Sequence, residues 1–214
     1  ALRALRSLDP NRGTMRGWAP YWYNLSHSLH LLGRREEERE AIRELRRRHP
    51  DSRAGWVHEA RYFASRGDTT ALDSLFAAAG HLTPDTYWSL GAAMTVAGEE
   101  LEAHGHAPLA ARYYAEAERW LAGRLLRSPD NRAHAYWLGS VYFDRGQWRE
   151  AEPYFAELAK ANNHDILFRG LWALTAAWEG DTLAARIRLG PLDPRDRGQH
   201  TAFRARIAAI GGDQ

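Results

Sequence analysis

The chain of 214 residues contains no cysteine, a single lysine and no long apolar run. The lack of cysteine excludes a disulfide framework, a thiolate zinc site and a cysteine nucleophile, and it leaves the redox compartment undecided. No apolar stretch reaches the roughly 18 to 20 residues that span a bilayer, and the N-terminus lacks a signal-peptide pattern. We therefore expect a cytoplasmic protein that does not bind membranes.

Positive charge is carried almost entirely by arginine, with 29 basic residues against 27 acidic ones and a net charge of +2. A balance so close to neutral gives no indication of nucleic-acid binding, and we expect no nucleic-acid partner. Hydrophobic residues make up 44% of the chain and charged residues 26%. These are ordinary values for a folded protein, and they disfavour disorder, collagen and coiled coil.

Residues of one type recur at a fixed spacing. Four pairs are separated by 34 positions: Trp22 and Trp56, Gly33 and Gly67, Pro50 and Pro84, and Gly146 and Gly180. Around these glycines the apolar residues follow the 3.6-residue period of helices, as residues 135–161 show on both sides of Gly146. Each repeat is therefore predicted to be a helical hairpin, and hairpins must stack to bury their apolar sides.

These residues resemble the tetratricopeptide repeat family. The first full unit matches its motif at Trp22, Leu25, Ser26, Leu29, Gly33, Ile42, Leu45 and Pro50. A later unit matches it at Leu138, Gly139, Tyr142, Gly146, Ala151 and Phe155. The resemblance implies an all-α fold, an antiparallel helix-hairpin solenoid wound as a right-handed superhelix, over nearly the whole chain. Glu59, Leu72, Ala135 and Asn163 depart from the motif.

One unit breaks the period. The spacing is 38 residues from Gly67 to Gly105 and 41 from Gly105 to Gly146. We expect an elongated hairpin, with a first helix from about Pro84 to His104 and a second from Pro108 to about Arg127, each of roughly 20 residues. The alternative places the turn at Gly98. The predicted units are 1–18 (partial), 19–52, 53–84, 85–131 (elongated), 132–165, 166–197 and 198–214 (partial).

Both ends of the chain are predicted to be incomplete units, so we expect a piece of a longer protein. Residues 1–10 have the pattern of the last turns of a second helix, and residues 200–210 that of a first helix. Terminal repeats need polar caps. We therefore expect partly uncovered apolar residues at both ends, which would permit self-association: Leu2, Leu5, Phe203 and Ile207.

No catalytic motif is present. The sequence lacks G-x-S-x-G, Walker and dinucleotide-binding patterns, and we assign no catalytic residue and no cofactor. The best metal candidate is Glu100 with His104 and His106, although capping of a helix C-terminus explains these residues better. The charged block from Arg34 to His49 alternates in sign at helical spacing, which is typical of a solvated outer face.

The resemblance to tetratricopeptide repeats also implies a binding surface on the inner side of the first helices. The residues at the corresponding positions, which include several aromatic rings, are Tyr23, His27, His30, Arg61, Trp88, Glu99, Tyr136, Ser140 and Phe143. Packing inside the hairpins is the alternative explanation for Trp88 and Tyr136.

We expect a noncatalytic scaffold that holds a protein or peptide segment in this aromatic groove. One alternative is a sensory or regulatory segment of a larger bacterial signalling protein. A metal-dependent helical enzyme that uses Glu100, His104 and His106 is a third.

Overall fold

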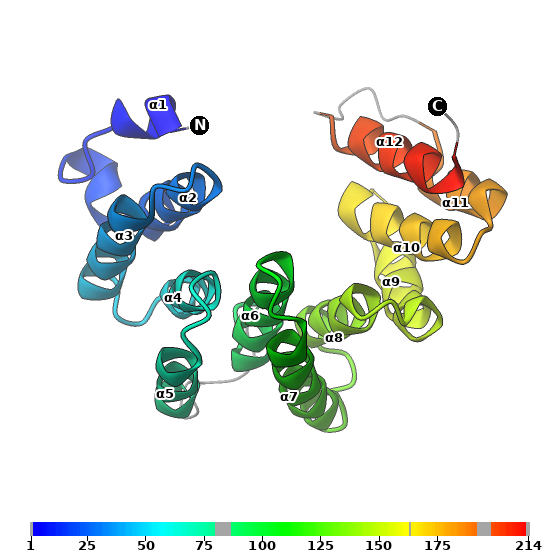
Figure 1. Cartoon of the computed structure of the whole chain (residues 1–214). Coiled ribbons are helices and arrows are strands. Elements are labelled where there is room, and N and C mark those ends of the chain that lie inside the picture. Colours follow the sequence, from blue (N-terminus) through cyan, green and yellow to red (C-terminus); the bar gives the residue numbers. More distant parts are fainter. Residues whose placement is uncertain (1, 80–86, 163, 192–197, 213–214) are drawn as a thin grey trace. The chain divides into compact units, whose positions relative to one another are not determined.

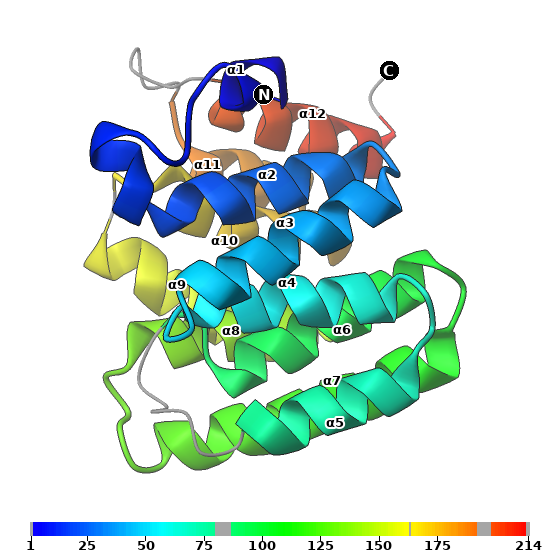
Figure 2. The same cartoon turned by 90° about the vertical axis from the view of Figure 1, so that its left-hand side faces the viewer.

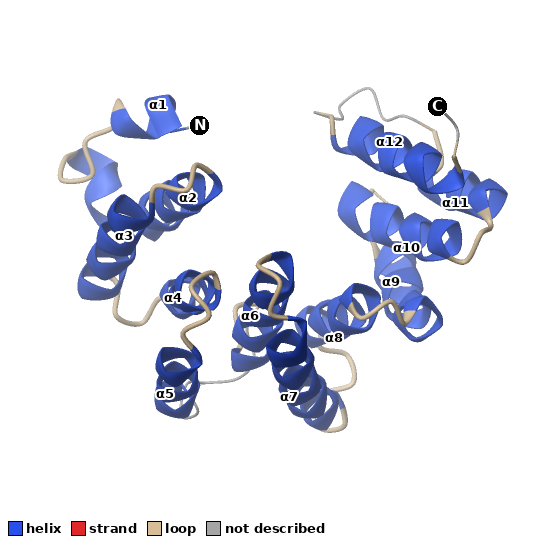
Figure 3. Cartoon of the chain, viewed as in Figure 1, coloured by secondary structure: helices blue, strands red, loops and turns tan. Residues whose placement is uncertain are grey.

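The computed structural model describes residues 2–79, 87–162, 164–191 and 198–212, and the regular structure in these ranges is entirely helical (Figure 3). This confirms the predicted all-α class. The chain divides into two compact units, residues 1–117 and 118–214. Among the described helices, none combines the length and the apolar composition that a membrane crossing requires.

Unit 1 is built from antiparallel helix pairs. Its elements are α1 (Leu2–Arg6), the 3-10 helix η1 (Gly13–Gly17), α2 (Ala19–Leu31), α3 (Arg35–Arg48), α4 (Arg53–Ala64), α5 (Thr69–Ala79), α6 (Leu90–Ala103) and the first part of α7 (Ala107–Leu125). Helix α2 packs on α3, and α4 packs on α5 (Figure 2). Because α4 also contacts both α2 and α6, the first helices of successive pairs lie side by side (Figure 1).

Unit 2 repeats this arrangement after the end of α7. Its elements are α8 (Arg132–Asp144), α9 (Trp148–Ala161), α10 (Ile166–Trp178), α11 (Thr182–Leu189) and α12 (Gln199–Gly211). The pairs α8–α9 and α10–α11 pack on each other through α9 and α10, and α12 packs on α10 and α11. Phe155 fills the interior of the first pair, and Leu174 and Leu189 that of the second.

The same glycine turn closes each of the five hairpins in the described parts of the chain. The turn glycines are Gly33, Gly67, Gly105, Gly146 and Gly180, with φ between 66° and 90°. In each turn the amide of the next residue donates to a carbonyl five positions back, as Arg34 does to Leu29 at 2.9 Å and Gln147 to Tyr142 at 2.8 Å. This is the Schellman cap, which requires a left-handed residue and therefore favours glycine.

The prediction of an elongated hairpin is correct for its second helix and wrong for its first. Helix α7 has 19 residues, and the turn lies at Gly105 rather than at Gly98. Helix α6, however, has only 14 residues and begins at Leu90, so the expectation of a first helix from Pro84 is wrong. The Ser89 side chain accepts a hydrogen bond from the Ala92 amide, which is an N-cap that fixes the start of the helix. Residues 80–86 lie outside the described residues.

The C-terminal end is better covered than predicted. Phe203 and Ile207 are only 8% and 1% exposed, because α12 packs them against α10 and α11. Gly170 leaves the space that the Phe203 ring occupies. Leu2 and Leu5 are half-buried, as expected for the other end. The prediction that Phe203 and Ile207 are partly uncovered is therefore wrong.

Close packing of α6 on α7 yields a stability prediction. A Cβ atom at Gly98 would lie 2.6 Å from the buried Tyr114 ring, whereas no atom lies within 4 Å of the corresponding position at Gly123. We expect Gly98→Ala to lower the free energy of unfolding by about 1–3 kcal/mol through overpacking. The matched Gly123→Ala substitution in α7 should raise it by about 0.5–1 kcal/mol. Urea denaturation of both variants tests this, and a stabilised Gly98→Ala protein would contradict the packing.

Candidate functional site

The first helices of unit 1 carry a partly exposed surface above a buried layer of polar side chains. The surface, here called the first-helix face, consists of Tyr23, His27, Arg61 and Glu100. The polar layer beneath it consists of Ser26, His30, Glu38 and His58, all buried. Four of the predicted site residues are therefore brought together: Tyr23, His27, His30 and Arg61.

Helical periodicity explains this placement. Tyr23, His27 and His30 are four and three positions apart on α2, so they lie along one side of that helix. His27 and Arg61 are separated by one 34-residue repeat and meet directly, with Arg61 Nη1 3.2 Å from His27 Nδ1. Equivalent positions of neighbouring hairpins thus come into contact, as stacking of repeats requires.

His58 is held neutral in the interior. Ser26 Oγ donates to the carbonyl of Tyr23 at 2.9 Å and lies 3.0 Å from His58 Nδ1. Because the single hydroxyl proton is used on the carbonyl, we assign the Nδ1 proton to His58. Burial, with a smaller contribution from the Arg61 charge, lowers the pKa of His58 to about 3. The buried serine is therefore not activated as a nucleophile by this histidine.

The pKa of His27 is lowered by the same two causes as that of His58. Burial lowers its pKa, and the positive charge of Arg61 lowers it further. Since a guanidinium can only donate, the Nδ1 lone pair of His27 accepts from Arg61. The Tyr23 ring stacks on His58 with centroids 5.8 Å apart. The exposed part of this face therefore combines an aromatic ring, a neutral imidazole and a guanidinium.

His30 differs from both because it lies between two carboxylates. Its Nδ1 is 2.9 Å from Glu38 Oε1, and its Nε2 is 3.1 Å from Glu100 Oε1. Burial on its own would lower the pKa of His30, but the hydrogen bonds to Glu100 and Glu38 outweigh it, and the pKa is raised. Burial would likewise raise the pKa of Glu100, but His30, Arg61 and His104 lower it.

The predicted metal candidate is not assembled. Glu100 and His104 lie 3.8 Å apart, but His106 packs against the turn at Gly67. Within the described parts of the chain, no three metal-ligating side chains converge. Glu100 instead bridges α2 and α4 through His30 and Arg61. His58 and Glu38 are missing from the predicted site, because their roles depend on partners in a neighbouring helix. The only sequence signal is a polar residue at a position that faces the core.

Two predicted residues of the elongated hairpin lie differently from expectation. Trp88 precedes α6, so its assignment to the inner side of that helix is wrong, and its ring packs edge-on against Tyr87 at 4.8 Å. Glu99 is on α6 and half-buried, next to Glu100.

The predicted site residues in unit 2 are buried or half-buried. Ser140 is buried, whereas Tyr136 and Phe143 are half-buried. Tyr136 lies against Phe168 with centroids 6.0 Å apart, and Phe143 lies against Phe155 at 6.2 Å. The two rings therefore contribute to the core of unit 2 and expose only part of their surface.

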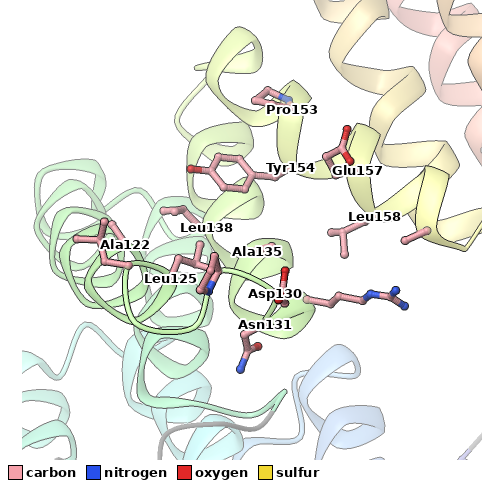
Figure 4. A pocket seen from close by; sticks show the side chains of 14 residues that line it. Ala122, Leu125, Asp130, Asn131, Ala135, Leu138, Pro153, Tyr154, Glu157 and Leu158 are labelled. Atoms are coloured by element: carbon pink, nitrogen blue, oxygen red, sulfur yellow. The ribbon is translucent and has the colours of Figure 1, made fainter.

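Unit 2 also contains a pocket that the sequence does not reveal. It has a volume of about 940 Å³ and lies between the end of α7, the connection to α8, and α9 (Figure 4). Leu125, Leu138 and Leu158 form apolar walls, and Asp130 and Glu157 add carboxylates. The wall from α7 comes from the last turns of a helix five residues longer than α9. The pocket is of the size that small ligands or anchor side chains occupy.

No family model matches the chain, and no curated protein matches it. A structure titled as the functional characterization of Pseudomonas aeruginosa pilF is 16% identical, with a TM-score of 0.45, over 91% of this chain and 85% of that one. The APC/C hetero-tetramer Cut9–Hcn1 is 14% identical, with a TM-score of 0.38, over 96% of this chain and 45% of that one.

The polar layer predicts a loss of stability in acid. Because the pKa of His58 is about 3 when folded and 6.5 when unfolded, the unfolded state takes up the proton first as pH falls. Between pH 6.5 and 4.5 this linkage removes about 2–3 kcal/mol of stability. Asparagine at this position can still donate a hydrogen bond to Ser26 but does not titrate. We therefore expect the free energy of unfolding of His58→Asn, measured by urea denaturation, to fall by about 2–3 kcal/mol less than that of the wild type between pH 6.5 and 4.5. The matched exposed substitution His164→Asn should behave like the wild type. Equal acid sensitivity of all three proteins would show that His58 does not carry the effect.

Proposed function

We propose that the chain is a noncatalytic interaction scaffold that binds an extended or helical segment of a protein on the first-helix face of unit 1. The observation that carries this proposal is that Tyr23, His27 and Arg61 lie together on one partly exposed surface. The buried, hydrogen-bonded side chains of the polar layer pack under this surface. Aromatic rings and arginine are the residues that most often dominate binding energy at interfaces.

Preorganisation supports a binding role for this face. The Tyr23 ring is stacked on the buried His58 ring, and His58 is itself fixed by its hydrogen bond to Ser26. Arg61 is held by Glu100, with Nε 3.4 Å from Oε1, and by His27. Side chains that are already ordered lose little conformational entropy when a partner binds. The Ser26 hydroxyl donates its proton to the Tyr23 carbonyl, which supports a noncatalytic role for the polar layer.

The outer side of unit 1 provides an internal comparison. Helix α3 carries exposed ion pairs along its length, such as Arg43 with Glu40 at 3.5 Å and Arg47 with Glu44 at 2.7 Å. Such solvated pairs contribute little to stability or binding. The half-exposed rings of Tyr136 and Phe143 in unit 2 are the counterpart of Tyr23 in our proposal.

Site-specific crosslinking in cells tests the proposed surface. A photoreactive amino acid at Tyr23 should crosslink to a partner protein, whereas the same group at the exposed Arg43 should give none or a different product. With the partner in hand, we expect Tyr23→Ala and Arg61→Gln to weaken binding about 10- to 100-fold, and Arg43→Gln about twofold or less.

Circular dichroism and thermal melting of each variant separate lost binding from lost folding. If the partner crosslinks only at position 43, or if Tyr23→Ala and Arg61→Gln bind normally while folded, the first-helix face is not the binding surface.

A further inference from the structure

His30 is surrounded by charged and titratable groups from four helices. Helix α3 contributes Glu38 and Arg35, and α6 contributes Glu100, which is itself paired with His104. Helix α4 contributes Arg61, which contacts Glu100, and the neutral His58. His27 lies one turn before His30 on α2. A histidine in such a cluster has a partner for either of its two protonation states.

The distances fit two alternative hydrogen-bond patterns at one nitrogen. As an imidazolium, His30 donates from Nδ1 to Glu38 Oε1 at 2.9 Å and from Nε2 to Glu100 Oε1 at 3.1 Å. As a neutral imidazole protonated at Nε2, it keeps the bond to Glu100, and its Nδ1 accepts from Arg35 Nη1 at 2.6 Å. Arg35 also donates to Glu38 Oε2 at 3.0 Å, so Glu38 keeps a partner in both states. The ring therefore changes its protonation state without having to turn.

The proton on His30 is linked to the surface through one oxygen atom. Glu100 Oε1 lies 3.1 Å from His30 Nε2 and 3.4 Å from Arg61 Nε. When His30 is neutral, the charges of Arg35, Arg61, Glu38 and Glu100 cancel, and when it is protonated the cluster carries one positive charge. Both states keep the bond from Nε2 to Glu100, but the positive charge of the imidazolium strengthens it, so that Glu100 neutralises the Arg61 charge less fully.

We propose that His30 is a proton-operated switch of the first-helix face, in which proton uptake replaces Arg35 by Glu38 at Nδ1 and loosens the Glu100–Arg61 pair. The switch is a property of this chain alone and does not require that the face binds a peptide. Its consequence is that the face becomes more positive in mildly acidic solution.

The direction of the proton linkage follows from the two carboxylates. They raise the pKa of folded His30 above the ordinary value of 6.5. A raised pKa means that the added stability of the protonated bridge from α2 to α3 and α6 is fully present below pH 6.5 and is lost as pH rises through the folded pKa. His27 and His58, whose pKa values are lowered, act in the opposite sense.

Histidine NMR titration of the intact chain tests the switch. We expect His30 to titrate above 6.5 in the wild type and about one pH unit lower in Glu100→Gln and in Glu38→Gln, because each removes an acceptor and a negative charge. Arg35→Gln should move the midpoint upward, because it removes a donor to the neutral ring and a positive charge. Arg35 is more exposed than Glu38, so this variant still tests the switch if a glutamine at a buried position disturbs folding.

A second signal separates a switch from a merely structural cluster. The Nε–H resonance of Arg61 should shift with the midpoint of His30 in the wild type and should not shift in Glu100→Gln. Arg47 is the matched control, because its Nε donates to Glu44 at 2.9 Å and the pKa of Glu44 is lowered to about 2. The proposal is overturned if wild-type His30 titrates at or below 6.5, if the three substitutions leave its midpoint unmoved, or if Arg61 does not follow it.

Discussion

The left-handed glycine in each hairpin turn is the constraint on which the rest of the structure depends. A residue with a Cβ atom is strained in this left-handed conformation. Without the left-handed conformation, the amide after the turn cannot reach the carbonyl five residues back. The repeated Schellman cap places the turn glycine two or three residues after the end of each of these first helices, and each second helix begins two residues after that glycine. Each hairpin therefore presents the same side of its first helix.

This common orientation turns sequence spacing into spatial contact. His27 and Arg61 are one repeat apart and touch, and Ser26 and His58 are nearly one repeat apart and touch. The contacts that define the candidate site are consequently contacts between repeats. Within the α8–α9 hairpin of unit 2, the two helices pack closely at Gly139, where an added Cβ atom would lie 3.0 Å from the Phe155 ring.

These facts explain which features the sequence predicts. The period of 34 residues and the turn glycines are local signals, so the helix pairs, the turn at Gly105 and the side of α2 that carries Tyr23, His27 and His30 follow from them. Helix ends depend on side-chain caps that are easily overlooked, and Ser89 shortens α6 for this reason. Burial of Phe203 depends on the space above Gly170, which lies 33 residues earlier in the sequence.

The charge states of the site are the least predictable feature, because they depend on groups from different helices. Three histidines of unit 1 lie within one region, yet burial and Arg61 hold two of them neutral, while Glu38 and Glu100 favour a proton on the third. Glu100 matches a metal ligand by its spacing to His104, but in the folded chain it is already engaged by His30 and Arg61. A repeat motif determines the positions of these titratable residues on their helices, but it does not determine which residues of neighbouring helices they contact. What distinguishes the candidate site from other faces of the repeats is therefore the set of pairs formed between repeats, since those are the positions that the repeat itself does not constrain.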